Sequence, residues 1–189
     1  MKKYKINEIF QSIQGEGRFT GHSAIFIRFA GCNLNCSFCD TEFETYKEYN
    51  AADILAKINM FNSDIIVLTG GEPALQVDAE LLQVLRLREK IKIHIETNGT
   101  INLSPWFNWV TVSPKNKTFK QISGGELKLL YDGTQDLDFY YINTTFREYY
   151  LQPLMDENYE KNLQATIKAI KNHSEWHLSL QIHKLINIK

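Results

Sequence analysis

The order of hydrophobic and polar residues along the chain predicts strands that alternate with helices. Several segments, such as Ile65–Thr69, are continuous apolar runs, as is typical of parallel strands covered on both faces. Strands alternating with helices indicate βα units around a mostly parallel sheet. The predicted strands are Ile6–Ile13, Ala24–Ala30, Ile65–Thr69, Ile91–Thr97, Trp109–Ser113, Glu126–Leu130, Phe139–Ile142, Glu148–Leu151 and Leu178–Ile182.

Three segments between these strands carry apolar residues at helical spacing and are predicted to be helices. They are Ala51–Phe61, Asp78–Glu89 and Asn158–Asn172, and Asn50 is placed to cap the first of them. Their expected apolar faces are Ile54, Ile58 and Phe61; Leu81, Leu85 and Arg88; and Leu163, Ile167 and Ile170.

The length of 189 residues suits one domain with a real core. A complete (βα)₈ barrel usually needs about 200 residues or more, so an open or partial barrel with fewer βα units is expected. The sequence contains no internal repeat, no low-complexity segment and no linker that would divide it. The prediction is an α/β fold, a compact partial βα barrel, over residues 1–189 as a single domain.

Charge and hydropathy limit which cellular compartments and which partners can be expected. The formal net charge is −1 and the lysines are spread along the chain, which gives no reason to expect a nucleic acid as partner. No apolar run approaches the roughly 20 residues that span a bilayer, so no membrane partner is expected. Met1–Tyr4 leads directly into a strand pattern without a signal-peptide core, and a cytoplasmic location is therefore expected.

The three cysteines, Cys32, Cys36 and Cys39, lie within eight residues. An odd number cannot pair completely into disulfides, and such closely spaced bridges would do little to staple a fold. In a reducing compartment clustered thiols are typical of metal ligands or redox groups. The spacing C-x₃-C-x₂-C therefore indicates chemistry at this loop.

Three thiolates from one loop can hold three irons of a [4Fe–4S] cluster and leave the fourth iron without a protein ligand. S-adenosylmethionine can chelate that iron through its amino and carboxylate groups, and an electron from the cluster then yields a 5′-deoxyadenosyl radical. A Cys₃His zinc site is less favoured because the nearest upstream histidine is His22. Three inert buried cysteines are disfavoured as well, and an electron-transfer ferredoxin would usually retain a fourth thiolate.

At this point the sequence resembles the radical S-adenosylmethionine superfamily, which this cysteine spacing defines. A second feature agrees: Ile65–Thr69 runs into Gly70-Gly71-Glu72-Pro73, about 30 residues beyond the cysteines. Glycines at a strand end allow the backbone to approach a ligand closely. In the superfamily the equivalent stretch binds the amino group of S-adenosylmethionine.

The N-terminal third narrows the resemblance to one family. Its segments Glu8–Gly17 and Phe26–Leu34 look like those of 7-carboxy-7-deazaguanine synthases, which convert 6-carboxy-5,6,7,8-tetrahydropterin into 7-carboxy-7-deazaguanine with loss of ammonia, on the route to queuosine. Further matching stretches are Cys39-Asp40-Thr41, Glu96–Gly99, Ser113–Lys115, Gln152-Pro153 and Leu180–Lys184. The resemblance implies a [4Fe–4S] cluster, S-adenosylmethionine, Mg²⁺, a pterin substrate, a homodimer and an electron donor such as flavodoxin.

The same resemblance assigns the site residues. Substrate contacts are carried over to Ile13, Gln14, Gly15, Arg28, Thr69 and Lys189. Cofactor contacts are carried over to Ser37, Phe38, Asp40, Gly71, Ser113, Lys115 and Gln152, and magnesium to the Thr41 hydroxyl. These residue types suit the roles: Arg28 offers a planar fork of donors for a carboxylate, and Mg²⁺ prefers hard oxygens with few protein ligands. Gln14 and Glu16 could read the hydrogen-bonding edge of a pterin.

Several alternatives stay open. Glu96 and Asn98 either line the cavity or cap a strand end, Lys115 could be a solvated loop lysine, and His183 in a predicted terminal strand is commonly structural. Phe38 replaces a tryptophan frequent in the family and should still stack on adenine. The alternative functions are a glycyl-radical activase, which the Gln14–Gly17 and Asp40-Thr41 patterns argue against, and a non-catalytic zinc module.

Overall fold

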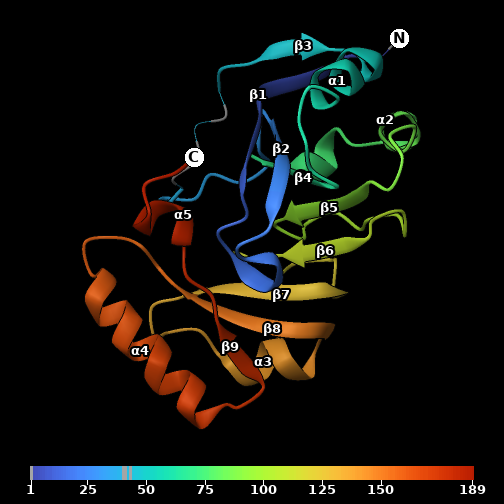
Figure 1. The fold of residues 1–189 in the computed structure, drawn as a ribbon. Helices are drawn as coiled ribbons and strands as arrows, with labels where there is room; N and C mark the ends of the chain where they lie inside the picture. Colours follow the sequence, from blue (N-terminus) through green and yellow to red (C-terminus); the bar gives the residue numbers. More distant parts are fainter. Residues whose placement is uncertain (1, 40–41, 43) are drawn as a thin grey trace. The chain divides into compact units, whose positions relative to one another are not determined.

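The computed structural model describes residues 2–39, 42 and 44–189, which form two compact units. The first unit consists of the residues up to Ile13, of Ser23–Thr97 and of Leu103–Val110. The second consists of Gln14–His22, Asn98–Asn102 and Thr111–Lys189. Each unit contains strands with helices packed on them, as Figure 1 shows, and each is described by itself.

The strands of the first unit are β1 (Tyr4–Ile13), β2 (Ser23–Phe29), β3 (Lys47–Tyr49), β4 (Ile65–Gly70) and β5 (Lys92–Thr97). Their order across the sheet is β3-β1-β2-β4-β5. The strands β2, β4 and β5 are parallel, as predicted, whereas β1 runs antiparallel to both β2 and β3. The short β3 was not predicted, since three residues are too few to show a pattern.

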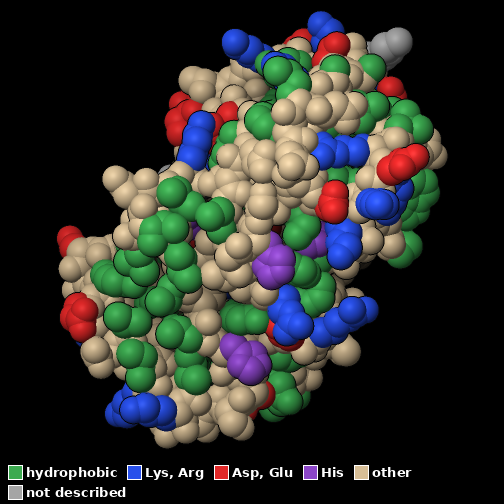
Figure 2. Space-filling model, viewed as in Figure 1, with side chains coloured by type: hydrophobic (Ala, Val, Ile, Leu, Met, Phe, Trp, Pro, Cys, Tyr) green, Lys and Arg blue, Asp and Glu red, His purple; other side chains and the backbone are tan. Residues whose placement is uncertain are grey.

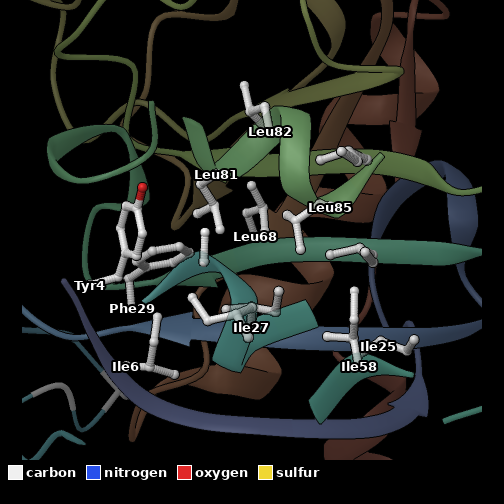
Figure 3. Close-up of a cluster of buried hydrophobic side chains, with 14 of the residues drawn as sticks. Tyr4, Ile6, Ile25, Ile27, Phe29, Ile58, Leu68, Leu81, Leu82 and Leu85 are labelled. Carbon is white, nitrogen blue, oxygen red and sulfur yellow. The ribbon is translucent and has the colours of Figure 1, made fainter. Parts of the chain in front are cut away.

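Helices α1 (Ala51–Ile58) and α2 (Ala79–Leu85) cover one face of this sheet. Strand residues that point to this face alternate along the chain, as the period of a β-strand requires. Figure 3 shows the resulting core, in which the labelled side chains are Tyr4, Ile6, Ile25, Ile27, Phe29, Ile58, Leu68, Leu81, Leu82 and Leu85. The predicted cap is confirmed: Asn50 and Asp53 form a reciprocal capping box at the start of α1.

The opposite face of the same sheet carries a smaller apolar cluster. Ala24, Phe26 and Val67 are buried there, and Phe10 stacks on Phe26 with ring centroids 5.2 Å apart. Towards the carboxyl ends of the strands this face becomes polar. Since the helices occupy the other face, the polar strand ends form the part of the first unit that can serve a ligand.

The second unit contains the end of β6 (Trp109–Val112) with β7 (Ser123–Tyr131), β8 (Thr145–Pro153) and β9 (Trp176–Leu178). These four strands are parallel and follow one another in the order β6-β7-β8-β9. The helices of this unit are α3 (Leu137–Ile142), α4 (Tyr159–Asn172) and α5 (Ile182–Leu185). None of the helices among the described residues is long and apolar enough to cross a membrane.

Helix α4 is oriented differently from its predicted apolar face. Its most buried residues are Asn162, Thr166 and Ala169, whereas the predicted Leu163, Ile167 and Ile170 are half-buried. Asn162 is satisfied because its Nδ2 donates to the Leu154 carbonyl (2.9 Å), and Thr166 donates to the Asn162 carbonyl (2.7 Å). Figure 2 accordingly shows hydrophobic side chains at the surface of the second unit where α4 lies.

Two strand predictions in the second unit are wrong. The segment Phe139–Ile142 belongs to α3, whose start is capped by Asp136 through the Phe139 amide (3.1 Å). A short apolar run cannot be assigned to strand or helix by periodicity alone, and here the cap decides. The predicted strand Leu178–Ile182 is also misplaced, because β9 ends at Leu178 and Ile182 already begins α5.

Candidate active site

The cysteine loop follows directly after β2. Cys32 and Cys36 are half-buried, Cys39 is exposed, and all three are thiols rather than disulfides. The Cys39 amide donates to the Cys36 carbonyl (3.1 Å) and closes a turn, while the Leu34 amide donates to the Cys32 sulfur (3.4 Å). Both bonds fix the backbone of the loop around the sulfurs.

The Gly-Gly-Glu-Pro turn is hydrogen-bonded to the start of this loop. The Gly71 amide donates to the Phe29 carbonyl (3.1 Å), and the Glu72 amide donates to the Gly31 carbonyl (2.9 Å). A Cβ atom on Gly71 would overlap the Gly31 carbonyl, so only glycine permits this approach. The two motifs singled out in the sequence therefore lie side by side.

The Glu72 side chain maintains the shape of the turn. It is fully buried, and its Oε1 accepts hydrogen bonds from the Ala74 amide (2.9 Å) and the Thr97 hydroxyl (2.8 Å). Glu72 thus caps the 3₁₀ turn Pro73–Leu75 and ties it to the end of β5. The glutamate of this motif supports the backbone whose amide and carbonyl groups face the loop.

A row of polar residues crosses the strand ends of the first unit. Strand register places Glu8 beside Arg28 and Arg28 beside Thr69. Arg28 Nε donates to Glu8 Oε1 (3.0 Å), and the Thr69 hydroxyl donates to Glu96 Oε2 (2.8 Å). We call Glu8, Arg28, Thr69 and Glu96 the polar row. Arg28 lies four residues before Cys32, and Thr69 directly precedes Gly70 of the glycine turn.

Arg28 is suited to bind an anionic group. The guanidinium lies 5.8 Å from the centre of the Phe10 ring, and its side chain is 24% exposed. The bond to Glu8 uses Nε and fixes the plane of the group, and within the described part of the chain Glu8 is its only ion-pair partner. The two terminal nitrogens form the fork that matches a carboxylate.

Two predicted site residues, Asp40 and Thr41, lie outside the described residues. Among the residues that are described, no three His, Cys, Asp or Glu side chains surround one metal-ion position. A cubane cluster binds each thiolate to a different iron, so it does not require the three sulfurs to converge on one point. Ser37 and Phe38 are exposed, Phe38 to 41%.

In the second unit the residues Gln14–Gly17 form a loop that is held at several points. Gln14 pairs with the segment that follows, since its amide donates to the His22 carbonyl (2.8 Å) and its carbonyl accepts from the Gly21 amide (2.8 Å). Gly15 is buried, and its carbonyl accepts a hydrogen bond from the Ile182 amide (3.0 Å). A Cβ atom there would overlap the His183 ring. His183, predicted in a strand, thus lies at the start of α5 against this loop.

Glu16 is the most heavily bonded side chain of the loop. One carboxylate oxygen pairs with the Lys128 ammonium, and the other accepts from Gln152 Nε2 (3.2 Å) and Gln181 Nε2 (2.9 Å). Burial alone would raise the pKa of Glu16, but the Lys128 charge and the hydrogen bonds from Lys128 and Gln181 outweigh it and lower the pKa. The carboxylate is therefore ionised at neutral pH.

Of the remaining predicted residues, Ser113, Lys115 and Gln152 form hydrogen bonds, whereas Ile13 and Lys189 are exposed. Ser113 and Lys115 are in contact, with Lys115 Nζ donating to the Ser113 hydroxyl (2.9 Å). Gln152 is almost fully buried, and its Oε1 accepts from the Ser179 hydroxyl (2.9 Å). Ile13, in the first unit, and Lys189, in the second, are exposed.

Sequence reasoning missed Lys128, Ser179 and Gln181 as parts of this site. One signal was present for Lys128: a lysine in the apolar stretch Leu127–Leu130 stands out in a buried parallel strand. Gln181 lies in the matching stretch Leu180–Lys184, but its role could not be predicted because its partner Glu16 is far away in the sequence, and Ser179 gave no signal for the same reason.

Comparison with known proteins agrees with this geometry. Residues 26–108 match the model of the radical SAM superfamily. The chain is 43% identical to the 7-carboxy-7-deazaguanine synthase of Bacteroides thetaiotaomicron and 34% identical to that of Caulobacter vibrioides, over 98% of this chain and 98% and 99% of those proteins. The crystal structure of QueE from Escherichia coli superimposes with a TM-score of 0.79 at 30% identity, covering 94% of this chain and 93% of that one.

The cysteine loop, the glycine turn and the superfamily match define a radical S-adenosylmethionine enzyme with a [4Fe–4S] cluster. The predicted fold class, a partial and open βα barrel with a mostly parallel sheet, is confirmed by the structural match. Within that class, the chain belongs to the 7-carboxy-7-deazaguanine synthase family.

The residues present fit this cofactor pair. Three thiols lie on one loop, two of them half-buried and one exposed, and none is closed into a disulfide. A side chain at Gly71 would overlap the Gly31 carbonyl, so glycine is what allows the turn to pack directly against the start of the cysteine loop. Cys32, Cys36 and Cys39 would hold the cluster.

Proposed function

We propose that this protein converts 6-carboxy-5,6,7,8-tetrahydropterin into 7-carboxy-7-deazaguanine with loss of ammonia, as a step towards queuosine. The observation that carries the proposal is the polar row, in which Arg28 and Thr69 lie on the strands that lead into the cysteine loop and the glycine turn. A pterin that bears a carboxylate needs a fixed cation and hydrogen-bonding side chains within reach of the cofactor. The names of the similar synthases support the same reaction.

The protein's part in the chemistry is to hold the cluster and to orient S-adenosylmethionine and the substrate. Bound together, the cluster and S-adenosylmethionine supply a 5′-deoxyadenosyl radical. Cys32, Cys36 and Cys39 would each bind one iron of the cluster. Gly71 lies against the start of the loop, with its amide bonded to the Phe29 carbonyl (3.1 Å).

Substrate binding is proposed for residues of both units. In the first unit the Arg28 fork would bind the substrate carboxylate, with Thr69 held next to it by Glu96 and with Ile13 exposed at the end of β1. In the second unit the contributors are Gln14, Gly15 and Lys189. Their assignment is supported by family resemblance, and for Gly15 also by its fixed, side-chain-free backbone.

Contacts to S-adenosylmethionine are likewise proposed by unit. Exposed Phe38 in the first unit offers a ring face for adenine, with Ser37 and Asp40 beside it in sequence and Gly71 at the turn. In the second unit we propose Ser113, Lys115 and Gln152. The contact between Ser113 and Lys115 supports a joint role for these two.

Magnesium is proposed at the Thr41 hydroxyl, where it would steady the substrate carboxylate. One threonine is enough, because Mg²⁺ retains waters and takes few protein ligands. If this is correct, Thr41→Ala lowers product formation more than it lowers cleavage of S-adenosylmethionine. Equal loss of both activities would argue against the metal assignment.

The wider setting is also a proposal and rests on family resemblance. The two units would act as one radical S-adenosylmethionine core domain, in a cytoplasmic homodimer that receives electrons from a donor such as flavodoxin. Sedimentation of the reconstituted protein tests the dimer, and reduction of the cluster by flavodoxin tests the donor.

The function is tested by anaerobic reconstitution followed by incubation with a reductant, S-adenosylmethionine and carboxytetrahydropterin. We expect 7-carboxy-7-deazaguanine, detected by mass spectrometry, together with ammonia. Cleavage of S-adenosylmethionine without this product would overturn the proposal and favour an activase. Purified protein that contains zinc but neither iron nor sulfide would favour the metal-binding module.

A further inference from the structure

One face of strands β7 and β8 carries buried charged and polar side chains, where buried strands usually carry apolar ones. Strand register places Glu126 beside Glu148 and Lys128 beside Tyr150, and Gln152 lies two residues further along the same face of β8. Glu126, Lys128 and Gln152 are each at most 6% exposed. Buried polar groups of this kind are stable only when they are bonded, so their partners are informative.

Those partners are the loop Gln14–Gly17 and the segment before α5. Glu16 accepts from Lys128, Gln152 and Gln181. The Ser179 hydroxyl accepts from the Gly17 amide (3.0 Å) and donates to Gln152. The loop is therefore fastened at once to β7, to β8 and to the C-terminal segment.

A second set of bonds repeats this pattern next to Gly17. Glu126 Oε2 accepts from the Arg18 amide (2.9 Å), and its Oε1 accepts from the Thr111 hydroxyl (2.9 Å). Gly17 has φ +62°, and a Cβ atom there would overlap the Glu126 carboxylate. The backbone of the loop is thus pressed directly onto the charged strand face.

We propose that Glu16 is a positioning residue for substrate binding. With Lys128, Gln152, Ser179 and Gln181 it forms a polar clasp that holds Gln14 and Gly15 against the C-terminal segment. The inference rests on the proposed function, because it takes the backbone of Gln14 and Gly15 as part of the pterin site. It differs from the expectation that Glu16 itself reads the pterin, since both carboxylate oxygens already accept bonds within the second unit.

The charges make the clasp selective for one loop conformation. An apolar contact could slide, whereas a buried carboxylate among one ammonium and two amides is satisfied in one geometry. Removing one partner of the Glu16–Lys128 ion pair takes away the counter-charge of the other, which weakens the clasp more than removing both partners. This asymmetry provides the test.

The experiment compares Glu16→Gln, Lys128→Met and the double variant with the wild-type enzyme. In each single variant we expect the KM for carboxytetrahydropterin to rise roughly 10-fold or more, with a smaller change in the KM for S-adenosylmethionine. In the double variant the carboxamide introduced at position 16 still accepts the amide bonds and both charges of the Glu16–Lys128 pair are gone, so the KM should recover most of the loss. Arg18→Gln is the control, since it breaks a half-exposed ion pair with Glu148 on the same loop and should change neither KM.

Hydrogen exchange gives a readout that needs neither substrate nor turnover. Peptides covering residues 14–22 and 179–189 should exchange roughly 10-fold faster in Glu16→Gln, because the Gly17 and Ile182 amides both bond across the clasp. A double variant no better than the single variants would overturn the clasp, as would unaltered exchange together with an unaltered pterin KM. A wild-type enzyme that forms no deazaguanine would instead overturn the proposed function.

Discussion

The first unit leaves Arg28 and the cysteine loop partly exposed at its strand ends, whereas the second unit buries Lys128 and Gln152 beneath a loop. Arg28 has one ion-pair partner among the described residues and is 24% exposed, and Cys39 and Phe38 are exposed. In the second unit the Lys128 side chain is 7% exposed and paired with Glu16. The two sets of polar groups therefore differ in how much of each group a ligand can reach.

This difference separates two tasks. Groups that must meet a ligand have to leave donors or sulfurs within its reach, as the Arg28 fork and the cysteine loop do. Groups that only hold a loop stabilise it best when their hydrogen-bonding positions are all filled by one another. Each buried hydrogen bond then reduces the number of conformations that the loop can adopt. We therefore expect substitutions of the cysteines to abolish chemistry, and substitutions of Arg28 or of the clasp residues to weaken substrate binding.

The largest effect is expected at the cysteine loop. Cys36→Ala should lose the cluster and all radical chemistry, because two thiolates cannot hold a cubane with one distinct iron. Iron and sulfide analysis after anaerobic reconstitution measures it, with Asn35→Ala on the same loop as the control. A Cys36→Ala protein with full iron content and activity would contradict the cluster assignment.

Arg28→Gln should have the next largest effect. A charge-assisted bond to a carboxylate contributes about 1.5–3 kcal/mol, so the KM for carboxytetrahydropterin should rise about 10- to 100-fold. Slow cleavage of S-adenosylmethionine without substrate should persist, since the cysteine loop is unchanged. Steady-state kinetics with both substrates decides this. An unaltered pterin KM would show that Arg28 binds something else.

The local patterns of the first unit were enough to predict most of its elements. The apolar run Ile65–Thr69 and the Asn50 cap both describe interactions within a few residues, and both predictions are confirmed. The cysteine spacing and the glycine turn were recognised as two separate motifs, without a prediction that they are hydrogen-bonded to each other. Their hydrogen bonds through Phe29 and Gly31 follow from the parallel pairing of β2 with β4, which no local pattern shows.

The second unit was harder to predict for a physical reason. Its clasp joins Glu16 to Lys128 and Gln181, which are distant in sequence, so neither periodicity nor spacing reveals it. The run Phe139–Ile142 was predicted as a strand because its propensity is ambiguous, and the Asp136 cap overrides it. Tertiary bonds, rather than local preference, determine this part of the chain.

A smaller effect is expected from replacing two glycines, Gly71 in the first unit and Gly21 in the second. Gly71 is required for steric reasons and Gly21 for its backbone conformation. Gly71→Ala should destabilise the protein by about 1–3 kcal/mol and weaken binding of S-adenosylmethionine, because the new methyl group overlaps the Gly31 carbonyl. Gly21→Ala meets no atom within 4 Å but has φ +88°, so it should cost about 1–2 kcal/mol of strain and leave cofactor binding intact. Urea unfolding and cofactor titration measure both quantities. Equal cofactor affinity in the two variants would contradict the role of the glycine turn.

The smallest effect is the acid sensitivity that the clasp adds. The Lys128 charge and the hydrogen bonds to Glu16 outweigh burial and hold the pKa of Glu16 below its ordinary value of 4.5. Since the folded-state pKa is the lower one, the ion pair stabilises the protein fully above about pH 4.5, and this contribution is lost as the pH falls through the folded-state pKa.

Comparison of the wild type with the double variant Glu16→Gln/Lys128→Met isolates this contribution. Asp78 in the first unit also has a lowered pKa, because hydrogen bonds from Leu81 and Lys2 outweigh its burial, but it is the same in both proteins. The free energy of unfolding, measured in urea between about pH 6 and pH 3, should therefore fall less steeply in the double variant. Identical slopes would mean that the pKa of Glu16 is the same in the folded protein and in the unfolded chain. The contrast between a reactive first unit and a second unit held together by charges would then lose its electrostatic basis.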